Sequence, residues 1–259
     1  MLSKILPLYR LTSGCDYHRI LLPFGYMGYD FSNVLNLTVE KMKSFKAIIF
    51  NRVPLNIPIG NLQRLREESG VKIIVDIDDY WVLYKEHYLY KHWEEIKMSS
   101  KIHDFIKMAD VVTCTTERLA NKVRPINPNV HVVPNAMPFS VSQDQFTLSK
   151  SDTTSTRFGF VGGTSHYPDI RTIQHVFQHF NHLKFSYCGL SSKSEEALKI
   201  ERICSNNKTN PNYTGISMSP LDKYMYNYND LDCCIAPLVD VEFNKYKSNL
   251  KVLEAGSKK

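Results

Sequence analysis

Short apolar runs alternate with longer stretches of helical spacing along the whole chain. In the first half the apolar runs cover residues 5–9, 47–50, 71–77, 111–114 and 130–133. Between them, residues 17–22, 59–69 and 100–108 have helical spacing, and we expect Pro23 to end the first of these helices and Gly70 to close the second. Strands that alternate with helices predict a parallel sheet whose strand carboxyl ends carry the ligand site.

The pattern stops at residues 140–156, where Ser, Thr, Gln and Asp dominate, and then starts again. The second set of apolar runs covers residues 158–161, 185–189 and 232–236, and a helix is expected from about Asp169. We therefore predict an N-terminal domain at 1–139, a linker at 140–156 and a second α/β domain at 157–259. Few residues follow Gly256, so we expect the second domain to be incomplete and the chain to be C-terminally truncated.

Composition supports a folded protein with a sizeable core. The chain has 259 residues with 43% hydrophobic and 12% aromatic content, and its net charge of +6 is thinly spread. No basic block suggests a nucleic-acid surface, and no run is long enough to span a membrane. The six cysteines show no metal-ligand spacing and are typical of reduced thiols. These features predict a cytoplasmic protein, with a peripheral approach to the inner face of a membrane left open.

The stretch from Glu242 to Gly256 carries the densest candidate chemistry. We expect a helix after Ser248, with Lys247, Lys251 and Glu254 at spacings i, i+4 and i+7 on one face. Two ammoniums beside a helix N-terminus suit a diphosphate, and a carboxylate one turn later suits a sugar diol. An exposed helix with a lysine pair fits the same pattern.

A glycine turn opens the second domain. Gly162 and Gly163 follow a strand and precede a helix, which lets backbone amides approach a phosphate, although a tight structural turn also has this form. His166 lies in the same loop. His175, His179 and His182 instead lie opposite an apolar stripe and are expected to form an exposed polar face and not a zinc site.

Three acids follow one strand of the first domain. Asp76, Asp78 and Asp79 exceed what helix capping requires, so we favour a polar-ligand site over a capping loop or a Mg²⁺ site. Trp81 follows them and is either a stacking surface for a sugar or lipid, or part of the core.

The ordered motifs resemble those of nucleotide-sugar glycosyltransferases with two Rossmann-like domains, the GT-B fold, and in particular the retaining bacterial cell-envelope group. The matching segments are 14–20, 76–81, 109–112, 115–120, 133–135, 162–166 with Asp169, 236–238, 247–251 and 254–255. The resemblance covers nearly the full length in the right order.

The resemblance implies two domains facing across a cleft, with the donor bound by the second and the acceptor by the first. It assigns donor binding to seven residues: Asn135, Gly162, Gly163, Lys247, Ser248, Lys251 and Glu254. It places Gly14, Asp16, Arg19 and Trp81 on the acceptor side. The catalytic candidates are Asp78, Asp79, His166 and Glu242. The group's commoner pattern has its first glutamate at the position of Tyr246, and here Glu242 lies four residues earlier.

The leading hypothesis is therefore a hexosyltransferase-like enzyme of polysaccharide biosynthesis. It would move a sugar from a nucleotide-diphosphate donor to a glycan or lipid-linked acceptor, with retention and with no metal or other cofactor. The alternative is a non-catalytic nucleotide-sugar-binding module or an inactive fragment. A phosphatase or receiver-like domain built on Asp76, Asp78 and Asp79 would leave the second domain unexplained.

Overall fold

The apolar runs of the first half form one parallel sheet with strand order β2-β1-β3-β4-β5-β6. The computed structural model describes residues 5–258, apart from 11–12, 30–31, 34–38, 55–56, 139–143, 147–155 and 192–193. Its strands are β1 (Ile5–Tyr9), β2 (Ser32–Asn33), β3 (Ala47–Asn51), β4 (Lys72–Ile77), β5 (Val111–Cys114) and β6 (Val130–Val132). Five of these strands were predicted. Strand β2 was not, because no apolar run marks it in the sequence.

The chain divides into two units, which are described separately. Unit 1 consists of Met1–Lys85, Leu89–Asn135 and Lys245–Ser248, and unit 2 of Glu86–Tyr88, Ala136–Asn244 and Asn249–Lys259. The expected fold class, α/β with two parallel Rossmann-like sheets, is confirmed. The division at residues 139 and 156 stays a prediction.

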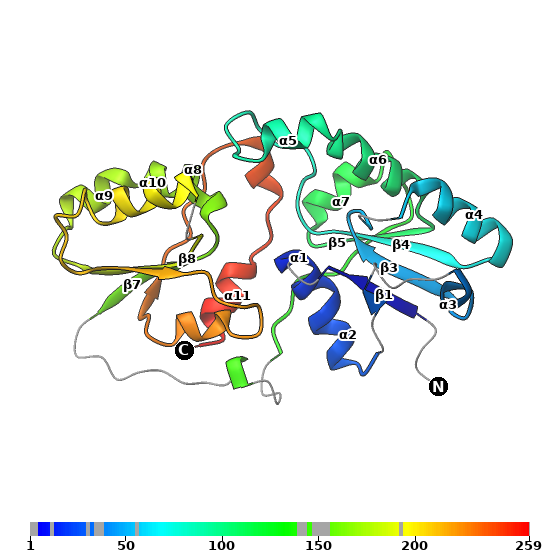
Figure 1. The fold of residues 1–259 in the computed structure, drawn as a ribbon, viewed down its shortest axis with the longest axis horizontal. Helices are drawn as coiled ribbons and strands as arrows, with labels where there is room; N and C mark the ends of the chain where they lie inside the picture. The colour runs from blue at the N-terminus through cyan, green and yellow to red at the C-terminus, as the bar shows by residue number, and fades with distance from the viewer. Residues whose placement is uncertain are drawn as a thin grey trace. The chain divides into compact units, whose positions relative to one another are not determined.

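Helices cover both faces of the unit 1 sheet (Figure 1). One face carries α4 and α6, and the other carries α1 and α2. The helices of this unit are α1 (Gly14–Asp16), a π-helical turn (Tyr17–Leu21), α2 (Leu22–Tyr26), α3 (Val39–Lys43), α4 (Ile59–Ser69), α5 (Tyr90–Glu95), α6 (Met98–Met108) and α7 (Glu117–Val123). The predicted close of α4 at Gly70 is confirmed, since Gly70 takes the left-handed conformation with φ of 70°.

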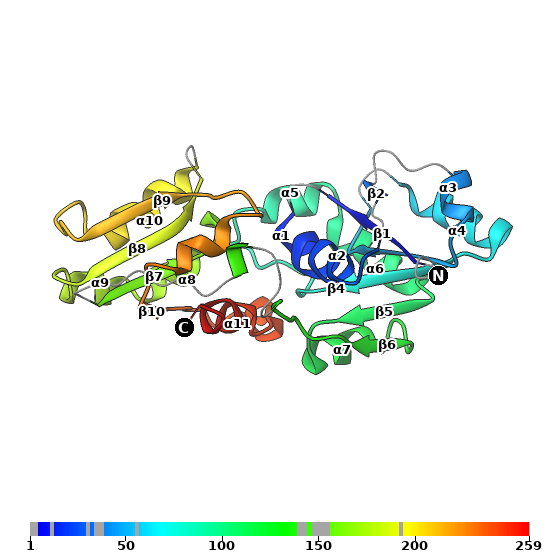
Figure 2. The same cartoon turned by 90° about the horizontal axis from the view of Figure 1, so that it is seen from below.

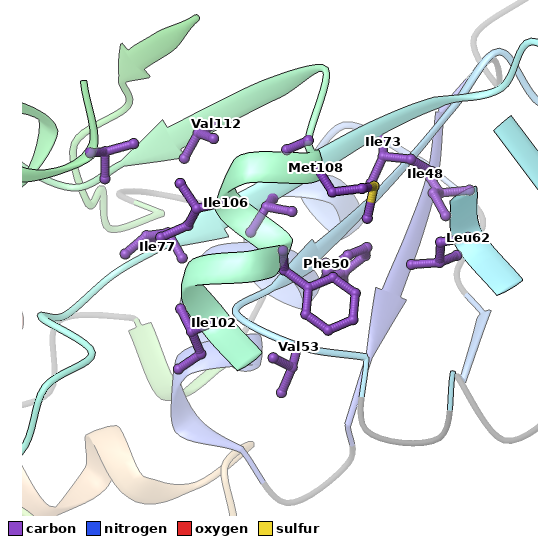
Figure 3. Packing of buried hydrophobic residues seen from close by; sticks show 14 of the residues in the cluster. Ile48, Phe50, Val53, Leu62, Ile73, Ile77, Ile102, Ile106, Met108 and Val112 are labelled. Carbon is purple, nitrogen blue, oxygen red and sulfur yellow. The ribbon is translucent and has the colours of Figure 1, made fainter. Parts of the chain in front are cut away.

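The main core of unit 1 lies between the sheet and helices α4 and α6 (Figure 3). Phe50 on β3 and Ile73 on β4 meet Ile106 on α6 and Leu62 on α4 within one buried cluster. Each such side chain contributes roughly 1.5–3 kcal/mol by leaving water. This packing fixes the sheet whose carboxyl edge carries the polar residues of unit 1.

The prediction that Pro23 ends the first helix is wrong. The helical segment starts at Gly14, where Ser13 Oγ caps it by accepting from the Asp16 amide, and it continues through Pro23 to Tyr26. The π-helical turn ends at Leu21, and Pro23 lies in the first turn of α2, where a proline is tolerated.

Unit 2 has a four-stranded parallel sheet in the order β10-β7-β8-β9. Its strands are β7 (Arg157–Val161), β8 (Lys184–Leu190), β9 (Tyr213–Ser217) and β10 (Cys233–Cys234). Helices α8 (Tyr167–Thr172), α9 (Gln174–His179) and α10 (Glu195–Cys204) cover one face, and α11 (Leu250–Gly256) lies on the other side of the sheet (Figures 1 and 2). Short 3₁₀ helices occupy Asp144–Phe146, Thr164–His166, Tyr224–Tyr228 and Glu242–Tyr246.

Two expectations for this half need comment. The run at 232–236 was predicted as a buried strand, but β10 pairs only two residues with β7, and Cys233 is exposed at the sheet edge. Most of the predicted linker lies outside the described residues. Within it, Gln145 and Phe146 are buried in unit 2, where Gln145 bonds to the backbone of Leu221 and Met225.

Candidate functional site

A glycine turn follows β7 in unit 2 and approaches the end of β8. The Gly162 amide donates to the Cys188 carbonyl at 2.8 Å, and the next residue, Gly189, has φ of 120°. A Cβ on Gly189 would lie 2.3 Å from the Gly162 carbonyl oxygen, so no side chain fits there. Two glycines from neighbouring strands therefore bring the two backbones into contact.

Lys251 and His166 converge on this turn. The point at which a Cβ on Gly162 would lie is 2.9 Å from the Lys251 ammonium nitrogen and 3.1 Å from the His166 Cδ2 atom. Lys251 donates to the Val161 carbonyl, and its ammonium lies over the Phe160 ring at 5.0 Å. An ammonium, an imidazole and the backbone of a glycine turn form a setting that attracts phosphate oxygens.

Asp169 contacts the same turn through His166. It is 4% exposed on α8, and its Oδ2 lies 2.7 Å from His166 Nδ1. Its other oxygen accepts from the Val239 amide at 2.9 Å and from Asn244 Nδ2 at 3.1 Å. Asp169 thus joins the glycine turn to the loop that follows β10.

Glu254 is the buried residue of α11. Its carboxylate accepts from Tyr224 Oη at 2.9 Å and from Tyr228 Oη at 2.7 Å, and 4% of the residue is exposed. Burial and the neighbouring Glu254 charge raise the pKa of Tyr228 well above its ordinary value, so this hydroxyl stays protonated and donates. Both tyrosines come from the Tyr224–Tyr228 3₁₀ helix.

The prediction that Lys247, Lys251 and Glu254 share one helix face is wrong for Lys247. Helix α11 starts at Leu250 with Asn249 as its N-cap residue, so Lys247 and Ser248 precede the helix. Lys247 belongs to unit 1, where its ammonium lies 3.7 Å from Asp79 Oδ2. Its assignment to donor binding stays a prediction that the helix no longer supports.

A second polar cluster occupies the carboxyl edge of the unit 1 sheet. Asp76, at the end of β4, forms a buried ion pair with Arg19, with Arg19 Nη2 at 2.8 Å from Oδ1. Asp76 also accepts from Thr113 Oγ1 at 2.6 Å and from Asn51 Nδ2 at 3.1 Å. Asp76 is therefore fully engaged within the protein.

The next two acids share one arginine. Arg52 Nε donates to Asp78 at 2.9 Å and Arg52 Nη2 lies 3.5 Å from Asp79. Burial opposes the charge on Asp78, yet Arg52 and further hydrogen bonds hold the pKa of this carboxyl well below its usual range. Arg52 itself adopts a left-handed backbone with φ of 56°, a strained state for a side chain with Cβ. Asp78 is thus a permanently ionised acceptor at ordinary pH.

The predicted acceptor-side residues join this cluster. Asp16 is buried and accepts two hydrogen bonds of 2.7 Å from the Arg10 guanidinium. Gly14 is the first residue of α1, the helix that contains Asp16. Arg19 also donates to Asn135 at 3.0 Å, and Asn135 Nδ2 donates to Ser248 Oγ at 2.7 Å. Segment Lys245–Ser248 thereby belongs to unit 1.

Three aromatic or acidic candidates lie elsewhere. Trp81 is 6% exposed within the unit 1 core, which favours the core interpretation of its ring. Tyr246, at the position of the family's first glutamate, is also buried there, with its ring 4.8 Å from that of Tyr80. Glu242 begins the 3₁₀ helix Glu242–Tyr246 and is exposed.

The histidine stripe is exposed as expected, although His182 lies beyond the end of α9. Within the described part of the chain, no group of three His, Cys, Asp or Glu side chains is arranged to hold a metal ion. None of the helices described is long and apolar enough to cross a membrane.

The structure therefore sorts the predicted residues into two clusters. Gly162, Gly163, His166, Lys251 and Glu254 form the group in unit 2, and the group in unit 1 is Gly14, Asp16, Arg19, Asp78, Asp79, Asn135, Lys247 and Ser248. Outside these clusters, Trp81 belongs to the core of unit 1 and Glu242 belongs to unit 2. Sequence reasoning gave no role to Gly189, Asp169, Tyr224 or Tyr228. Gly189 ends a predicted strand and Asp169 belongs to a motif that carries the family resemblance, whereas the two tyrosines had no local signal.

Comparison with known proteins identifies the fold. No protein-family model matches the chain, and no curated protein matches it in sequence. Among solved structures, a sucrose-phosphate synthase from Thermosynechococcus elongatus is similar with a TM-score of 0.62 and 9% identity, covering 91% of this chain and 77% of that one.

Two further structures give the same result. A glycosyltransferase from Rickettsia africae has a TM-score of 0.53 at 9% identity, with 90% and 72% of the two chains covered. The lipopolysaccharide outer core galactosyltransferase WaaB has a TM-score of 0.52 at 12% identity, with 98% and 78% covered. At these identities the likeness shows the fold, which is that of the GT-B glycosyltransferases.

Proposed function

We propose that the chain is a glycosyltransferase that moves a sugar from a nucleotide-diphosphate donor to a glycan or lipid-linked acceptor. The observation that carries the proposal is the convergence of Lys251 and His166 on the backbone of Gly162, in a chain with the fold of known glycosyltransferases. Such a turn neutralises the two phosphates of a donor and stabilises the diphosphate as it departs.

Unit 2 is the donor-binding part in this proposal. Lys251, His166 and the backbone amides of the turn beyond Gly162 hold the diphosphate, and Glu254 is the acceptor for the ribose hydroxyls. Because positive side chains supply the neutralisation, the proposal includes no metal ion. Excess chelator should then leave the transfer rate unchanged, and a loss of the rate would contradict this part.

Unit 1 binds the acceptor in this proposal. Its polar edge carries Asp78 and Asp79, which with His166 and Glu242 are the proposed catalytic side chains. The low pKa of Asp78 suits electrostatic stabilisation of positive charge better than proton exchange at neutral pH. Retention of configuration, a place in cell-surface polysaccharide synthesis and a cytoplasmic location at the membrane face belong to the proposal as well. One similar structure is named as a lipopolysaccharide outer core galactosyltransferase, which supports a glycan acceptor.

The test is transfer of label from a panel of UDP, GDP, CDP and ADP sugars into a bacterial lipid or glycan extract. The proposal predicts labelled product with one nucleotide. Two matched variants accompany the assay. Lys251→Ala removes the ammonium at the glycine turn, and the control Lys199→Ala removes a lysine of α10 that pairs with Glu195. Binding of a nucleotide sugar with no transfer to any acceptor would indicate a non-catalytic binding module instead.

A further inference from the structure

Asp169 is a buried carboxylate that accepts hydrogen bonds from a backbone amide and a side-chain amide. The Val239 amide and Asn244 Nδ2 bind one oxygen, and His166 Nδ1 lies 2.7 Å from the other. An ionised carboxylate can only accept hydrogen bonds, so His166 Nδ1 must be the donor of this pair. The proton on that ring nitrogen is therefore set by Asp169.

This hydrogen bond also aims the ring. The His166 ring packs edge-on against Phe160, with centroids 5.1 Å apart, and its Cδ2 edge lies against Gly162. Nε2 is bonded to Cδ2, so the second nitrogen lies on the edge of the ring that borders the glycine turn. Asp169 thus holds Nδ1, and Nε2 is the ring nitrogen on the side of the glycine turn.

A positive charge on the His166 ring is opposed by the nearby Lys251 ammonium and favoured by the Asp169 carboxylate. The Lys251 ammonium and the His166 ring edge both lie about 3 Å from the same point beside Gly162, and two positive groups this close repel each other. Two further titratable groups are connected to this turn: Tyr187, whose hydroxyl donates to the Gly163 carbonyl at 2.9 Å, and Cys234, whose pKa is raised by burial and partly lowered by the Lys251 ammonium. Asp169 is the carboxylate in contact with His166, and its negative charge favours a second proton on the ring.

We propose that Asp169 is a positioning residue that holds His166 with Nδ1 protonated, so that Nε2 can carry a second proton and donate it as a hydrogen bond to an anionic phosphate oxygen. The nature of that ligand rests on the proposed function, but the state of the ring does not. The glycine turn then presents two positive donors, Lys251 and His166, in place of one.

The ring state can be measured in the full chain labelled with ¹⁵N-histidine, with the His166 signals assigned by their loss in His166→Gln. We expect a proton on Nδ1 in the free protein. When a nucleoside diphosphate is added, chosen by thermal shift from UDP, GDP, CDP and ADP, both ring nitrogens should be protonated. A free protein in which His166 Nδ1 lacks a proton would overturn the proposal without any variant of Asp169.

Asp169→Asn supplies the second arm. Its remaining oxygen can still accept from Val239 and Asn244, while its new N–H faces Nδ1 and turns that nitrogen into an acceptor. We expect Nδ1 to lose its proton and the affinity for the diphosphate to fall roughly three- to tenfold, because a neutral donor replaces a charged one. Asp222→Asn, an exposed change in the same unit, should alter neither.

The outcomes separate the two ideas. A folded Asp169→Asn protein with unchanged ring signals and unchanged affinity would overturn the role of Asp169. If the parent protein binds none of the four diphosphates, the proposed function fails, and the Nδ1 signal of the free protein alone decides the role of Asp169.

Discussion

Glu254 shows how a single buried charge depends on its neighbours. A carboxylate taken out of water costs several kcal/mol unless hydrogen bonds compensate for the lost hydration. Tyr224 and Tyr228 supply these bonds, one to each oxygen. A ribose diol would have to share or replace these donors, so the tyrosines determine how readily Glu254 binds a sugar.

Tyr228→Phe removes one of these tyrosine donors and leaves the ring in place. We expect the free energy of unfolding to fall by about 1–3 kcal/mol, because a buried charged acceptor loses a partner. Urea unfolding measures this change. Tyr226→Phe on the same 3₁₀ helix is the control, because Tyr226 is 41% exposed and should shift stability by less than about 0.5 kcal/mol. Equal effects of the two changes would contradict the assigned role.

Asp78 is the residue whose charge has a defined pH window. Its folded-state pKa is held well below the ordinary value by Arg52 despite burial. A carboxyl with a depressed pKa stabilises the fold fully above its unfolded pKa of about 4, and this contribution is lost as the pH falls through the folded pKa.

The stability difference between the parent and Asp78→Asn should therefore stay constant from pH 5 to pH 8. Below about pH 4 the parent should lose its advantage over the variant. Denaturant titrations at each pH test this, with Asp104→Asn on the exposed side of α6 as the control. A difference that changes between pH 5 and pH 8 would show that Asp78 titrates there and is not held ionised by Arg52.

At the scale of elements, the glycine turn depends on two strands that the sequence separates. Gly162 follows β7 and Gly189 lies near the end of β8, and their backbones are in close contact. Gly163 differs, because a Cβ there would have only Ser165 Oγ within reach, at 3.9 Å. The three glycines should respond differently to the same substitution.

Gly189→Ala should destabilise unit 2 strongly and abolish nucleotide binding, because a Cβ collides with the Gly162 carbonyl and the backbone is left-handed. Gly163→Ala should leave the fold intact. Circular dichroism and thermal unfolding distinguish the two. A Gly189→Ala protein as stable as Gly163→Ala would mean that the turn does not need the close approach described.

The elements with strong local signals were predicted from sequence, and those fixed by tertiary contacts were not. Helix α4 has periodic leucines and a terminal glycine, so both of its ends were predictable. The helix through Pro23 was missed because a π-helical turn leaves no sequence signal. Lys247 was misplaced because α11 begins at Leu250, and spacing alone does not fix a helix start to within one turn.

At the scale of the whole molecule, the alternation of apolar runs and helical spacing was enough to predict two parallel sheets. The same pattern did not predict which residues contact each other within the two polar clusters. Glu254 meets tyrosines 26 and 30 residues earlier in the chain, and Asp169 meets Val239 and Asn244 some 70 residues later. Such pairings depend on how the strands are ordered, which no short motif encodes.

The central claim is that the glycine turn of unit 2 binds the diphosphate of a nucleotide sugar through Lys251. Titration calorimetry with the UDP, GDP, CDP and ADP sugars measures it directly on the parent chain, on Lys251→Ala and on the control Lys199→Ala. We predict that the parent binds one nucleotide, that Lys199→Ala binds it equally, and that Lys251→Ala loses about 1–3 kcal/mol of binding free energy, roughly 5- to 150-fold in affinity. If Lys251→Ala binds the same nucleotide sugar as tightly as the parent, the diphosphate does not lie at this turn.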